Sequence, residues 1–383
     1  MGNQFLRVLN TCTLLVAGPD TWIEGQAIQQ LETTAKLKGM HAVAGMPDLH
    51  PGRGYPVGAA FFSTGYIYPA LVGNDIGCGM SLWQTDIKHN TFKYDKAEKL
   101  IASIDQPLAD GERSRLLVQD MTQSSYDYPF NVCGTIGGGN HFAELQLIDI
   151  VYDHTLCGLA GLNTKQLQLL VHSGSRGLGE KVLRHHISQH GHQGLVCGSP
   201  EFEQYVQAHD KALLYAQANR KLIALRLLSR LKAKGQSVLD IFHNTVTPAT
   251  IQNTCGWLHR KGAAPADQGL VVIPGSRGDY SYIVQPLVNE ASQQALFSLA
   301  HGAGRKWIRS ECKGRLKHFS VAQLKRSTLG SRLICCNSDL VYEEAPQAYK
   351  SIESVIHALE GAGLVQKVAR LRPMLTYKTQ KEK

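Results

Sequence analysis

The chain has 383 residues, of which 43% are hydrophobic and 19% are charged. This balance excludes a disordered chain and suffices for one large domain or two ordinary ones, at about 100–200 residues per domain. Lysine and arginine outnumber aspartate and glutamate by 40 to 31, and the net charge of +9 favours a polyanionic partner such as nucleic acid or nucleotide phosphates.

The composition also predicts a soluble, cytoplasmic protein. No stretch approaches the ~18–20 consecutive apolar residues of a membrane helix. The nine cysteines are an odd number and form no CxxC pair, which is typical of reduced thiols. The apolar stretch over residues 5–17 is interrupted by Arg7 and Asn10 and precedes no cleavage pattern, so we expect no secretion.

The first hundred residues have the pattern of short strands and turns, because apolar pieces such as residues 59–62 alternate with Gly- and Pro-rich segments. Residues 46–58 form a loop by composition, and this loop carries a carboxylate, an imidazole and a guanidinium. A helix is predicted from Tyr94 through Ile104, and the chain then loosens around residues 124–129.

Two glycine-rich segments carry candidate ligands. Asp75 and Cys78 lie three residues apart in the first, where backbone freedom lets a carboxylate and a thiolate converge on one ion. Taken alone, this segment is more often a tight turn with a buried cysteine than a metal site. The second, residues 134–144, places His141 and Glu144 just after three glycines. A phosphate-binding loop is one interpretation, but the Gly-Lys-Ser/Thr ending of a Walker motif is absent.

Further histidines follow along the chain. His172 precedes Arg176 in a Gly/Ser-rich segment, His243 follows an apolar run, and His259 opens a predicted basic loop. Taken singly, each is more often a hydrogen-bonded core or surface residue than a ligand. Together with the carboxylate and the thiolate they suit a borderline divalent metal such as manganese or zinc, and the thiolate can bridge two ions.

Two regular patterns have a structural interpretation. His185, His186, His190 and His192 form the densest histidine cluster, but no nearby carboxylate or glycine loop supports catalysis, so we interpret them as surface residues. Apolar residues at three- and four-residue spacing predict a long amphipathic helix over residues 201–234. The other face of this helix carries Lys211, Arg220, Lys221, Arg226 and Arg230.

We interpret that basic helix face as solvated, with RNA contact as the alternative. No Pro/Ser/Gly linker divides the chain, and candidate residues lie on both sides of the long helix. We therefore expect residues 1–383 to form a single domain, with residues 201–234 as a helical insertion.

His301 stands in the small-residue segment His-Gly-Ala-Gly-Arg and is sterically open. An imidazole in such a place can attack a phosphoryl group, while metal ions and arginines offset the charge of the transition state. A tight turn with an incidental histidine is the structural alternative.

Taken in order, these segments resemble the RtcB family of GTP-dependent RNA-splicing ligases, over about residues 41–378. The motifs that carry the resemblance are residues 73–80, residues 134–144, His-Ser-Gly-Ser-Arg-Gly from His172, His-Asn from His243, His-Arg-Lys-Gly-Ala from His259, Pro-Gly-Ser from Pro274 and His-Gly-Ala-Gly-Arg from His301. The resemblance implies an α/β fold of mixed sheets around a central metal and nucleotide cleft.

The resemblance also implies site residues. Two Mn²⁺ ions would be held, with Cys78 as the bridge, by Asp75, Cys78, His141, His172 and His243. His301 would be the guanylylated nucleophile, with Arg176 in the catalytic centre. The GTP site carried over comprises Asn140 near the phosphates and a guanine pocket of Phe142, Glu144, Ser276, Ser281, Ala303, Gly304, Tyr349 and Lys378.

The implied reaction joins an RNA 3′-phosphate or 2′,3′-cyclic phosphate to a 5′-hydroxyl, in tRNA or rRNA splicing or repair. GMP is carried first by the histidine and then by the RNA 3′-phosphate, where it supplies a leaving group. A thiolate bridge suits manganese more than magnesium, which prefers oxygen.

Two segments depart from the usual family pattern. Asp48-Leu-His-Pro-Gly-Arg-Gly-Tyr-Pro stands where many relatives have Val-His-Leu-Gly-Lys-Gly-Ala, and Lys-Trp-Ile-Arg follows Arg305 where Arg-Met-Ser-Arg is usual. We expect both segments to lie away from the metal ligands and to bear on RNA contacts. They indicate a divergent bacterial branch, for which a release-factor-like protein or an activating protein is the candidate protein partner.

Two other functions remain open at this point. A manganese-dependent phosphodiesterase would open 2′,3′-cyclic ends without GTP and without ligation. A non-enzymatic RNA-repair factor would bind broken RNA through the net positive charge, with a strong dependence on salt.

Overall fold

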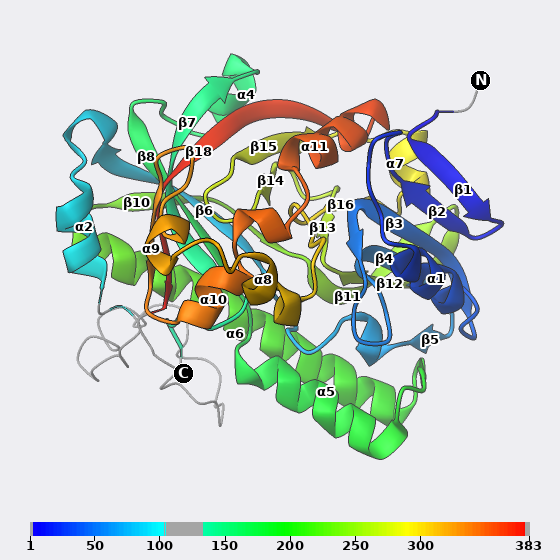
Figure 1. Ribbon diagram of the computed structural model, residues 1–383. Helices are drawn as coiled ribbons and strands as arrows, with labels where there is room; N and C mark the ends of the chain where they lie inside the picture. The colour runs from blue at the N-terminus through cyan, green and yellow to red at the C-terminus, as the bar shows by residue number, and fades with distance from the viewer. Residues whose placement is uncertain (1–2, 103, 105–132, 380–383) are drawn as a thin grey trace.

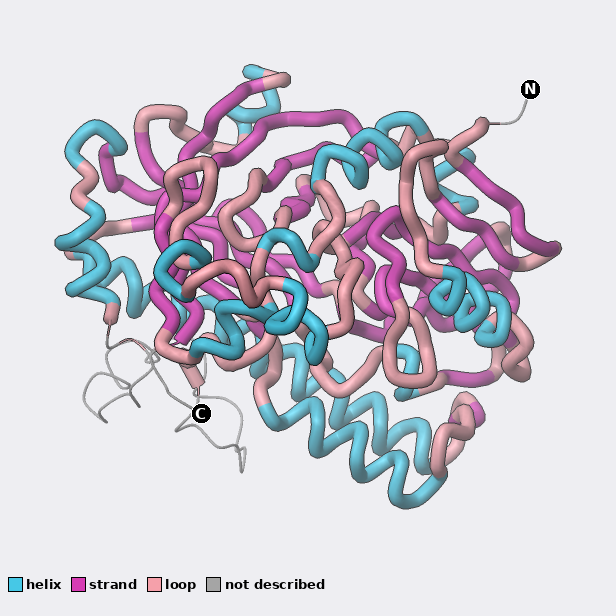
Figure 2. Tube along the Cα trace, viewed as in Figure 1, coloured by secondary structure: helices cyan, strands magenta, loops and turns pink. Residues whose placement is uncertain are grey.

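The computed structural model describes residues 3–102, 104 and 133–379. The loosened stretch predicted around residues 124–129 lies outside the described residues. Strands occupy the middle of the molecule and helices lie around them (Figure 2).

One sheet has six strands, and it contains much of the N-terminal part of the chain. Its order is β1 (Leu6–Asn10), β2 (Thr13–Val16), β3 (Met40–His50), β4 (Val57–Ser63), β12 (Thr254–Lys261) and β11 (Asn244–Ile251). The first helix, α1 (Gly25–Thr34), packs against β3. The apolar residues 59–62 lie in β4, where they are fully buried.

The other large sheet has eight strands and positions most of the candidate ligands. Its order is β10 (Gly235–Phe242), β6 (Gly79–Lys88), β8 (Gln166–Ser173), β7 (Phe142–Val151), β18 (Val365–Thr379), β15 (Ser281–Pro286) and β14 (Val271–Pro274), and β17 (Arg332–Cys335) pairs with β18. The β2–β3 and β17–β18 pairs are parallel, while the other described pairs are antiparallel.

Smaller elements complete the molecule. Two short sheets pair β13 (Ala263–Pro265) with β16 (Ser298–Ala300) and β5 (Tyr66–Ile67) with β9 (Leu195–Val196). The single-turn 3-10 helices are η1 (Pro69–Leu71), η2 (His89–Thr91) and η4 (Pro346–Ala348). The shorter α-helices are α2 (Tyr94–Ile101), α4 (His154–Leu159), α7 (Glu290–Gln294), α8 (Arg309–Arg315), α9 (Val321–Leu324), α10 (Ser338–Glu343) and α11 (Ile352–Gly361).

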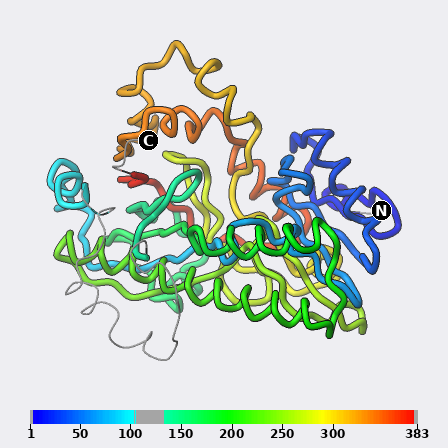
Figure 3. The backbone as a smooth tube through the Cα atoms, turned by 90° about the horizontal axis from the view of Figure 1, so that it is seen from below, coloured from blue at the N-terminus to red at the C-terminus, as the bar shows by residue number. Residues whose placement is uncertain are grey.

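Two longer helices, α5 (Gly177–His190) and α6 (Pro200–Leu231), lie side by side below the sheets (Figures 1 and 3). α6 begins at Pro200, where the Ser199 side chain accepts a hydrogen bond from the Phe202 amide and so caps the helix. It contacts β6 and β8, and therefore supports the strands that lead to the candidate ligands.

The expectation of a solvated basic face on α6 is wrong for two of its residues. Arg220 and Arg226 are buried, at 0% and 2% exposure. Arg220 donates to Asp240 on β10 and to the backbone oxygens of Gly77 and Ser173. Charge spacing alone does not distinguish a solvated arginine from one that joins three segments in the interior.

The mixed α/β class is confirmed, and the largest apolar cluster combines residues from both large sheets. That residues 1–383 form one domain stays a prediction. Within the described part of the chain, no helix combines the length and apolar character needed to cross a membrane.

Candidate active site

The sheet register brings four of the candidate ligands to one place. Met80 on β6 and Phe142 on β7 are both paired with His172 on β8. Cys78 immediately precedes β6, and His141 immediately precedes β7. Both residues therefore lie at the same end of the sheet as His172. On the other side of β6, the His243 amide donates to the Cys78 carbonyl over 2.8 Å.

The side chains form two triads that share one sulfur. Asp75, Cys78 and His141 form one, and Cys78, His172 and His243 form the other, with ligand atoms within 4.8 Å of one another. The Cys78 Sγ lies 3.4 Å from His141 Nε2 and 3.2 Å from His172 Nε2. His141 Nε2 lies 2.8 Å from Asp75 Oδ2.

Burial sets the charge state of two histidines in this cluster, His172 and His243. It lowers the pKa of His172 and of His243 well below the ordinary value, and neighbouring imidazoles lower it further. Burial also raises the pKa of the Cys78 thiol, to which the Asp75 carboxylate adds. Burial opposes ionisation of Asp75, but His141, Cys78 and Arg176 together outweigh it, so the pKa of that carboxyl falls below its usual value.

The cluster fits divalent metal ions by its donor chemistry. Neutral imidazoles offer a free lone pair, and the Asp75 carboxylate offers negative charge. Cys78 would add a second negative charge as a thiolate, because a metal ion that binds its sulfur displaces the thiol proton. His141 Nδ1 and His243 Nδ1 are buried and make no hydrogen bond within the described structure. At His141 the nitrogen that faces Cys78 and Asp75 is Nε2, so this is the nitrogen that a metal ion in the first triad would bind.

His301 lies beside this cluster, with its ring centroid 4.9 Å from that of His243. Its Nδ1 lies 2.6 Å from Oδ2 of Asp48, which is fully buried, and its backbone amide donates to the same oxygen. An Nδ1–H donated to Asp48 leaves the Nε2 lone pair free for a phosphorus atom. The loop is tight, since a Cβ on Gly304 would approach the Asp48 carbonyl oxygen to 2.3 Å.

This contact corrects one expectation from the sequence. The segment that begins at Asp48 was expected to lie away from the metal ligands, yet Asp48 orients the imidazole next to them. Arg53 and Arg309, from the two divergent segments, line the same cavity as Asp75 and Cys78. Residues 253 positions apart meet here, and no local sequence signal indicates that contact.

That cavity has a volume of about 890 Å³. It is lined by Asp75, Cys78, His141, His243 and His301, together with Asn140, which was expected near the phosphates, and Arg176, which was expected in the catalytic centre. Lys261 also lines the cavity, at the end of β12, and burial lowers its pKa to about 8. Lys261 was not predicted as a site residue, although it lies in the His-Arg-Lys-Gly-Ala motif.

The expected guanine-pocket residues form two hydrogen-bonded groups. In the first, the Gln146 amide donates to Glu144 over 2.7 Å and to Ser281 over 2.8 Å, and Thr376 donates to Glu144. Burial raises the pKa of Glu144 to about 7, although these hydrogen bonds and Lys378 oppose the rise.

The second group surrounds Glu344, which the sequence did not reveal as a candidate. Tyr349 donates to this carboxylate, Lys378 lies 3.9 Å from it, and Arg305 and Arg309 pair with it. Burial lowers the pKa of Lys378 to about 8, against the attraction of Glu344. Glu344 belongs to none of the sequence motifs, so only its contacts in the folded chain identify it as a candidate.

The remaining predicted pocket residues occupy adjoining positions. The Phe142 ring lies 5.5 Å from that of His172. Pro274 pairs with Ser281, and Ser276 lies in the turn that joins β14 to β15. Ala303 and Gly304 follow His301, and the Gly304 carbonyl accepts from the Lys350 amide.

Two histidine expectations need correction. His186 is buried at 4% exposure rather than on the surface, and its Nε2 has no hydrogen-bond partner, while His185 and His192 are exposed as expected. His259 lies within β12 rather than in a loop. There its Nε2 accepts from the Tyr68 amide and its Nδ1 donates to the Phe61 carbonyl, which explains its burial without a ligand role.

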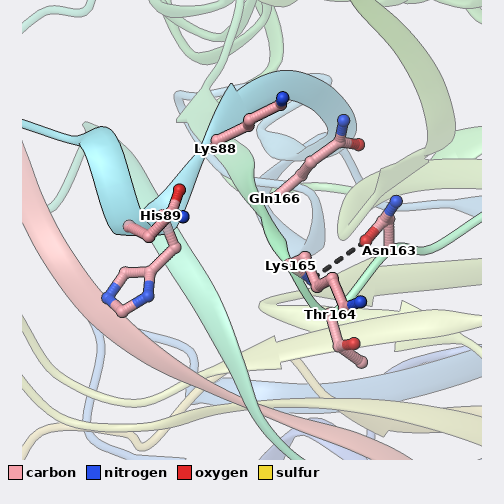
Figure 4. A pocket seen from close by; sticks show the side chains of 7 residues that line it. Lys88, His89, Asn163, Thr164, Lys165 and Gln166 are labelled. Atoms are coloured by element: carbon pink, nitrogen blue, oxygen red, sulfur yellow. Dashed lines mark hydrogen bonds between the residues drawn. The ribbon is translucent and has the colours of Figure 1, made fainter.

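A second pocket, of about 500 Å³, lies at the opposite end of β6 and β8 from the metal cluster. Figure 4 shows its polar lining, in which the Lys165 amide donates to the Asn163 side chain over 2.9 Å. The side chains around it are Lys88, His89, Asn90, Asn163, Thr164, Lys165 and Gln166. None of them is a predicted site residue.

Comparison with known proteins identifies the family. The family model described as tRNA-splicing ligase RtcB matches residues 30–128 and 111–379. RNA-splicing ligase RtcB2 of Escherichia coli is 55% identical over 377 residues, which cover 98% of each chain. The tRNA-splicing ligases RtcB of Archaeoglobus fulgidus and Thermococcus kodakarensis are 28% and 29% identical, over 92% of this chain and 91% and 90% of theirs. The chain therefore belongs to the RtcB family of RNA-splicing ligases.

Proposed function

We propose that this protein is an RNA ligase that joins RNA 3′-phosphate or 2′,3′-cyclic phosphate ends to 5′-hydroxyl ends with GTP. One observation carries the assignment. Two triads of candidate metal ligands share Cys78, and they lie beside a histidine whose Nδ1 is paired with the buried Asp48. A nucleotidyl transfer through an imidazole needs positive charge next to a free ring nitrogen, and metal ions held by these triads would supply that charge.

Asp75, Cys78 and His141 would hold one Mn²⁺ ion, and Cys78, His172 and His243 would hold the other. When bound, the two ions supply charge neutralisation at the reacting phosphates and lower the pKa of attacking hydroxyl groups. The mixed sulfur, nitrogen and oxygen donors support manganese over magnesium, which prefers oxygen ligands.

The first step is guanylylation of His301. The Nε2 lone pair attacks the α-phosphorus of GTP, an N–P bond forms, and the bond from that phosphorus to the bridging oxygen breaks to release pyrophosphate. Asp48 accepts the Nδ1–H throughout, so the ring keeps the tautomer that exposes Nε2. Asn140 and Arg176 line the same cavity and would contact the phosphates.

The later steps transfer GMP to RNA and then release it. Water opens a cyclic end to the 3′-phosphate, whose oxygen attacks the GMP phosphorus as the N–P bond breaks. The 5′-hydroxyl oxygen then attacks the RNA phosphorus, loses its proton and displaces GMP. Arg176, Lys261 and Arg309 line the cavity and would offset the charge of these transition states.

The guanine base would be held by the residues around Glu144 and Glu344. Glu144 would accept hydrogen bonds from the guanine N–H groups, and Phe142 and Tyr349 would contact its ring. Ser276, Ser281, Ala303, Gly304 and Lys378 complete this proposed pocket. The hydrogen-bonded groups around Glu144 and Glu344 support it, because they fix the side chains before GTP arrives.

The physiological setting is part of the proposal. The substrates would be broken tRNA or rRNA in the cytoplasm, and a release-factor-like protein or an activating protein would be the protein partner. The 55% identity to RtcB2 of Escherichia coli supports a divergent bacterial branch.

The assignment is tested by incubating the purified protein with α-labelled GTP and Mn²⁺, followed by denaturing electrophoresis. The wild type should carry the label, whereas His301→Ala and Cys78→Ala should lose it. His89→Ala, in the pocket of Figure 4, is the matched histidine control and should label normally. Labelling of His301→Ala would contradict the proposed nucleophile. Opening of cyclic ends without labelling of the wild type would favour the phosphodiesterase.

A further inference from the structure

The cavity at the metal cluster extends well beyond the reacting groups, along one face of α5. Gly177, Glu180, Leu183, Arg184 and Ile187 of that helix all line it. The spacing of three and four residues places them on one side of the helix. The helix begins beside Arg176, so at about 1.5 Å per residue Ile187 lies about 15 Å further along the groove.

The expected guanine pocket does not occupy this extension. None of Phe142, Glu144, Ser276, Ser281, Ala303, Gly304, Tyr349 and Lys378 is among the described residues that line the cavity. The base of GTP would therefore lie outside this part of the cavity. The part of the cavity along α5 is left for the second substrate, which is an RNA strand.

The charges along the extension suit a phosphodiester backbone. Arg53 faces the cavity from the divergent loop, and Arg184 faces it from α5. Arg184 is paired with Glu180 at 2.6 Å, but its side chain is 78% exposed, and an exposed pair of this kind contributes little free energy. A phosphate can therefore compete for this guanidinium. The first residue of α5, Gly177, also lines the cavity, so the partial positive charge of the helix N-terminus lies at its edge.

The groove also offers surfaces for bases. Leu183 and Ile187 are partly buried on the cavity side of α5. His192, just after the helix, lines the same cavity, and its ring lies 6.3 Å from that of Tyr55. Aromatic rings and apolar side chains are the usual platforms for unpaired bases.

We propose that the groove between α5 and Arg53 binds the single-stranded RNA next to the reacting end, with Arg53 and Arg184 contacting backbone phosphates. A groove of about 15 Å accommodates about four stacked nucleotides at about 3.4 Å each. This inference rests on the proposed ligase function. It assigns two substrate-positioning residues away from the metal ligands and from His301.

The test uses the full-length protein with Arg53→Ala, Arg184→Ala and the double variant. RNA binding is measured at several salt concentrations with a ten-nucleotide strand and with a dinucleotide, each bearing either a 3′-phosphate or a 5′-hydroxyl. Because each arginine contacts one phosphate, each substitution should reduce the slope of log affinity against log salt by about 0.7 for the longer strand. The dinucleotide should be much less affected.

Several controls make the outcome decisive. Labelling by α-labelled GTP should stay at the wild-type rate in all three variants, because neither arginine touches GTP. Arg53→Lys and Arg184→Lys should recover most of the binding. Lys88→Ala with Lys165→Ala removes the same charge in the distant pocket of Figure 4 and should leave RNA binding unchanged.

The two RNA ends distinguish which substrate strand uses the groove. A reduced slope for only the 3′-phosphate strand or only the 5′-hydroxyl strand supports the proposal for that strand. Wild-type slopes with both strands, or equal losses in the distant double variant, would overturn it. If the wild type binds RNA but is never labelled by GTP, the ligase assignment fails. The groove proposal is then still decided by the slopes of log RNA affinity against log salt.

Discussion

Among single residues, the contact between Asp48 and His301 matters most for the proposed chemistry. The Asp48 side chain is fully buried, and its Oδ2 lies 2.6 Å from His301 Nδ1. A buried carboxylate in this position fixes which ring nitrogen carries the proton. The paired imidazole can then present a lone pair to phosphorus without first changing its tautomer.

We therefore expect Asp48→Asn to slow guanylylation. The amide can donate a hydrogen bond to Nδ1 and so favour the wrong tautomer, and the rate should fall by about 100-fold or more. Single-turnover labelling with α-labelled GTP measures this rate. Manganese binding should persist, because Asp48 belongs to neither triad. A wild-type labelling rate in Asp48→Asn would show that Asp48 does not set the reactive tautomer of His301.

The pH dependence of GTP binding is a second prediction for individual residues. Burial raises the pKa of Glu144 to about 7 and lowers that of Lys378 to about 8. Glu144 is ionised above its pKa and Lys378 is charged below its own. GTP affinity should therefore be highest between about pH 7 and 8, falling on the acid side through Glu144 and on the alkaline side through Lys378.

Equilibrium binding of GTP from pH 6 to pH 9 checks this profile. In Glu144→Gln, affinity should be lower and the acid limb should disappear, while the alkaline limb should remain. An unchanged acid limb in Glu144→Gln would mean that another group titrates there.

Among the secondary-structure elements, helix α6 has a structural role, because it joins strands that lead to the candidate metal ligands. Arg220 links this helix to Asp240 on β10, to Gly77 before β6 and to Ser173 at the end of β8. The pair with Asp240 is largely shielded from water. A buried guanidinium with all these partners holds the ends of three adjacent strands together.

Removal of this guanidinium should destabilise the protein. Arg220→Met leaves Asp240 without its counter-charge, and we expect the free energy of unfolding to fall by about 3–5 kcal/mol, as measured by urea denaturation. The double variant Arg220→Met/Asp240→Leu should recover part of that loss. Gln217→Ala, on the exposed side of α6, is the control. A loss no larger than that of the control would show that the pair does not support the fold.

The sequence predicted the periodic elements well and the contacts between them poorly. The long helix expected over residues 201–234 corresponds to α6, because its apolar spacing is a local signal. The burial of Arg220 depends on Asp240, twenty residues away, and on two carbonyl groups in other segments. Glycine-rich motifs indicated the candidate metal donors, but Asp48 and Glu344 became candidates for the site only when distant segments came together.

At the scale of the whole molecule, the eight-stranded sheet is the scaffold of the site. Neighbouring antiparallel strands β6, β8 and β7 bring Cys78, His172 and His141 to one end of the sheet, and β10 adds His243. The six-stranded sheet contributes Asp48 from β3. The proposed reaction centre thus lies where the two large sheets meet, with the groove along α5 open beside it.

The central claim is that two ions share the sulfur of Cys78 next to His301. Anomalous diffraction from a crystal grown with Mn²⁺ tests it most directly. The account predicts two manganese peaks, one bound by Asp75 and His141, the other by His172 and His243, with Cys78 Sγ ligating both. A single peak, or two peaks of which neither contacts Cys78, would contradict it.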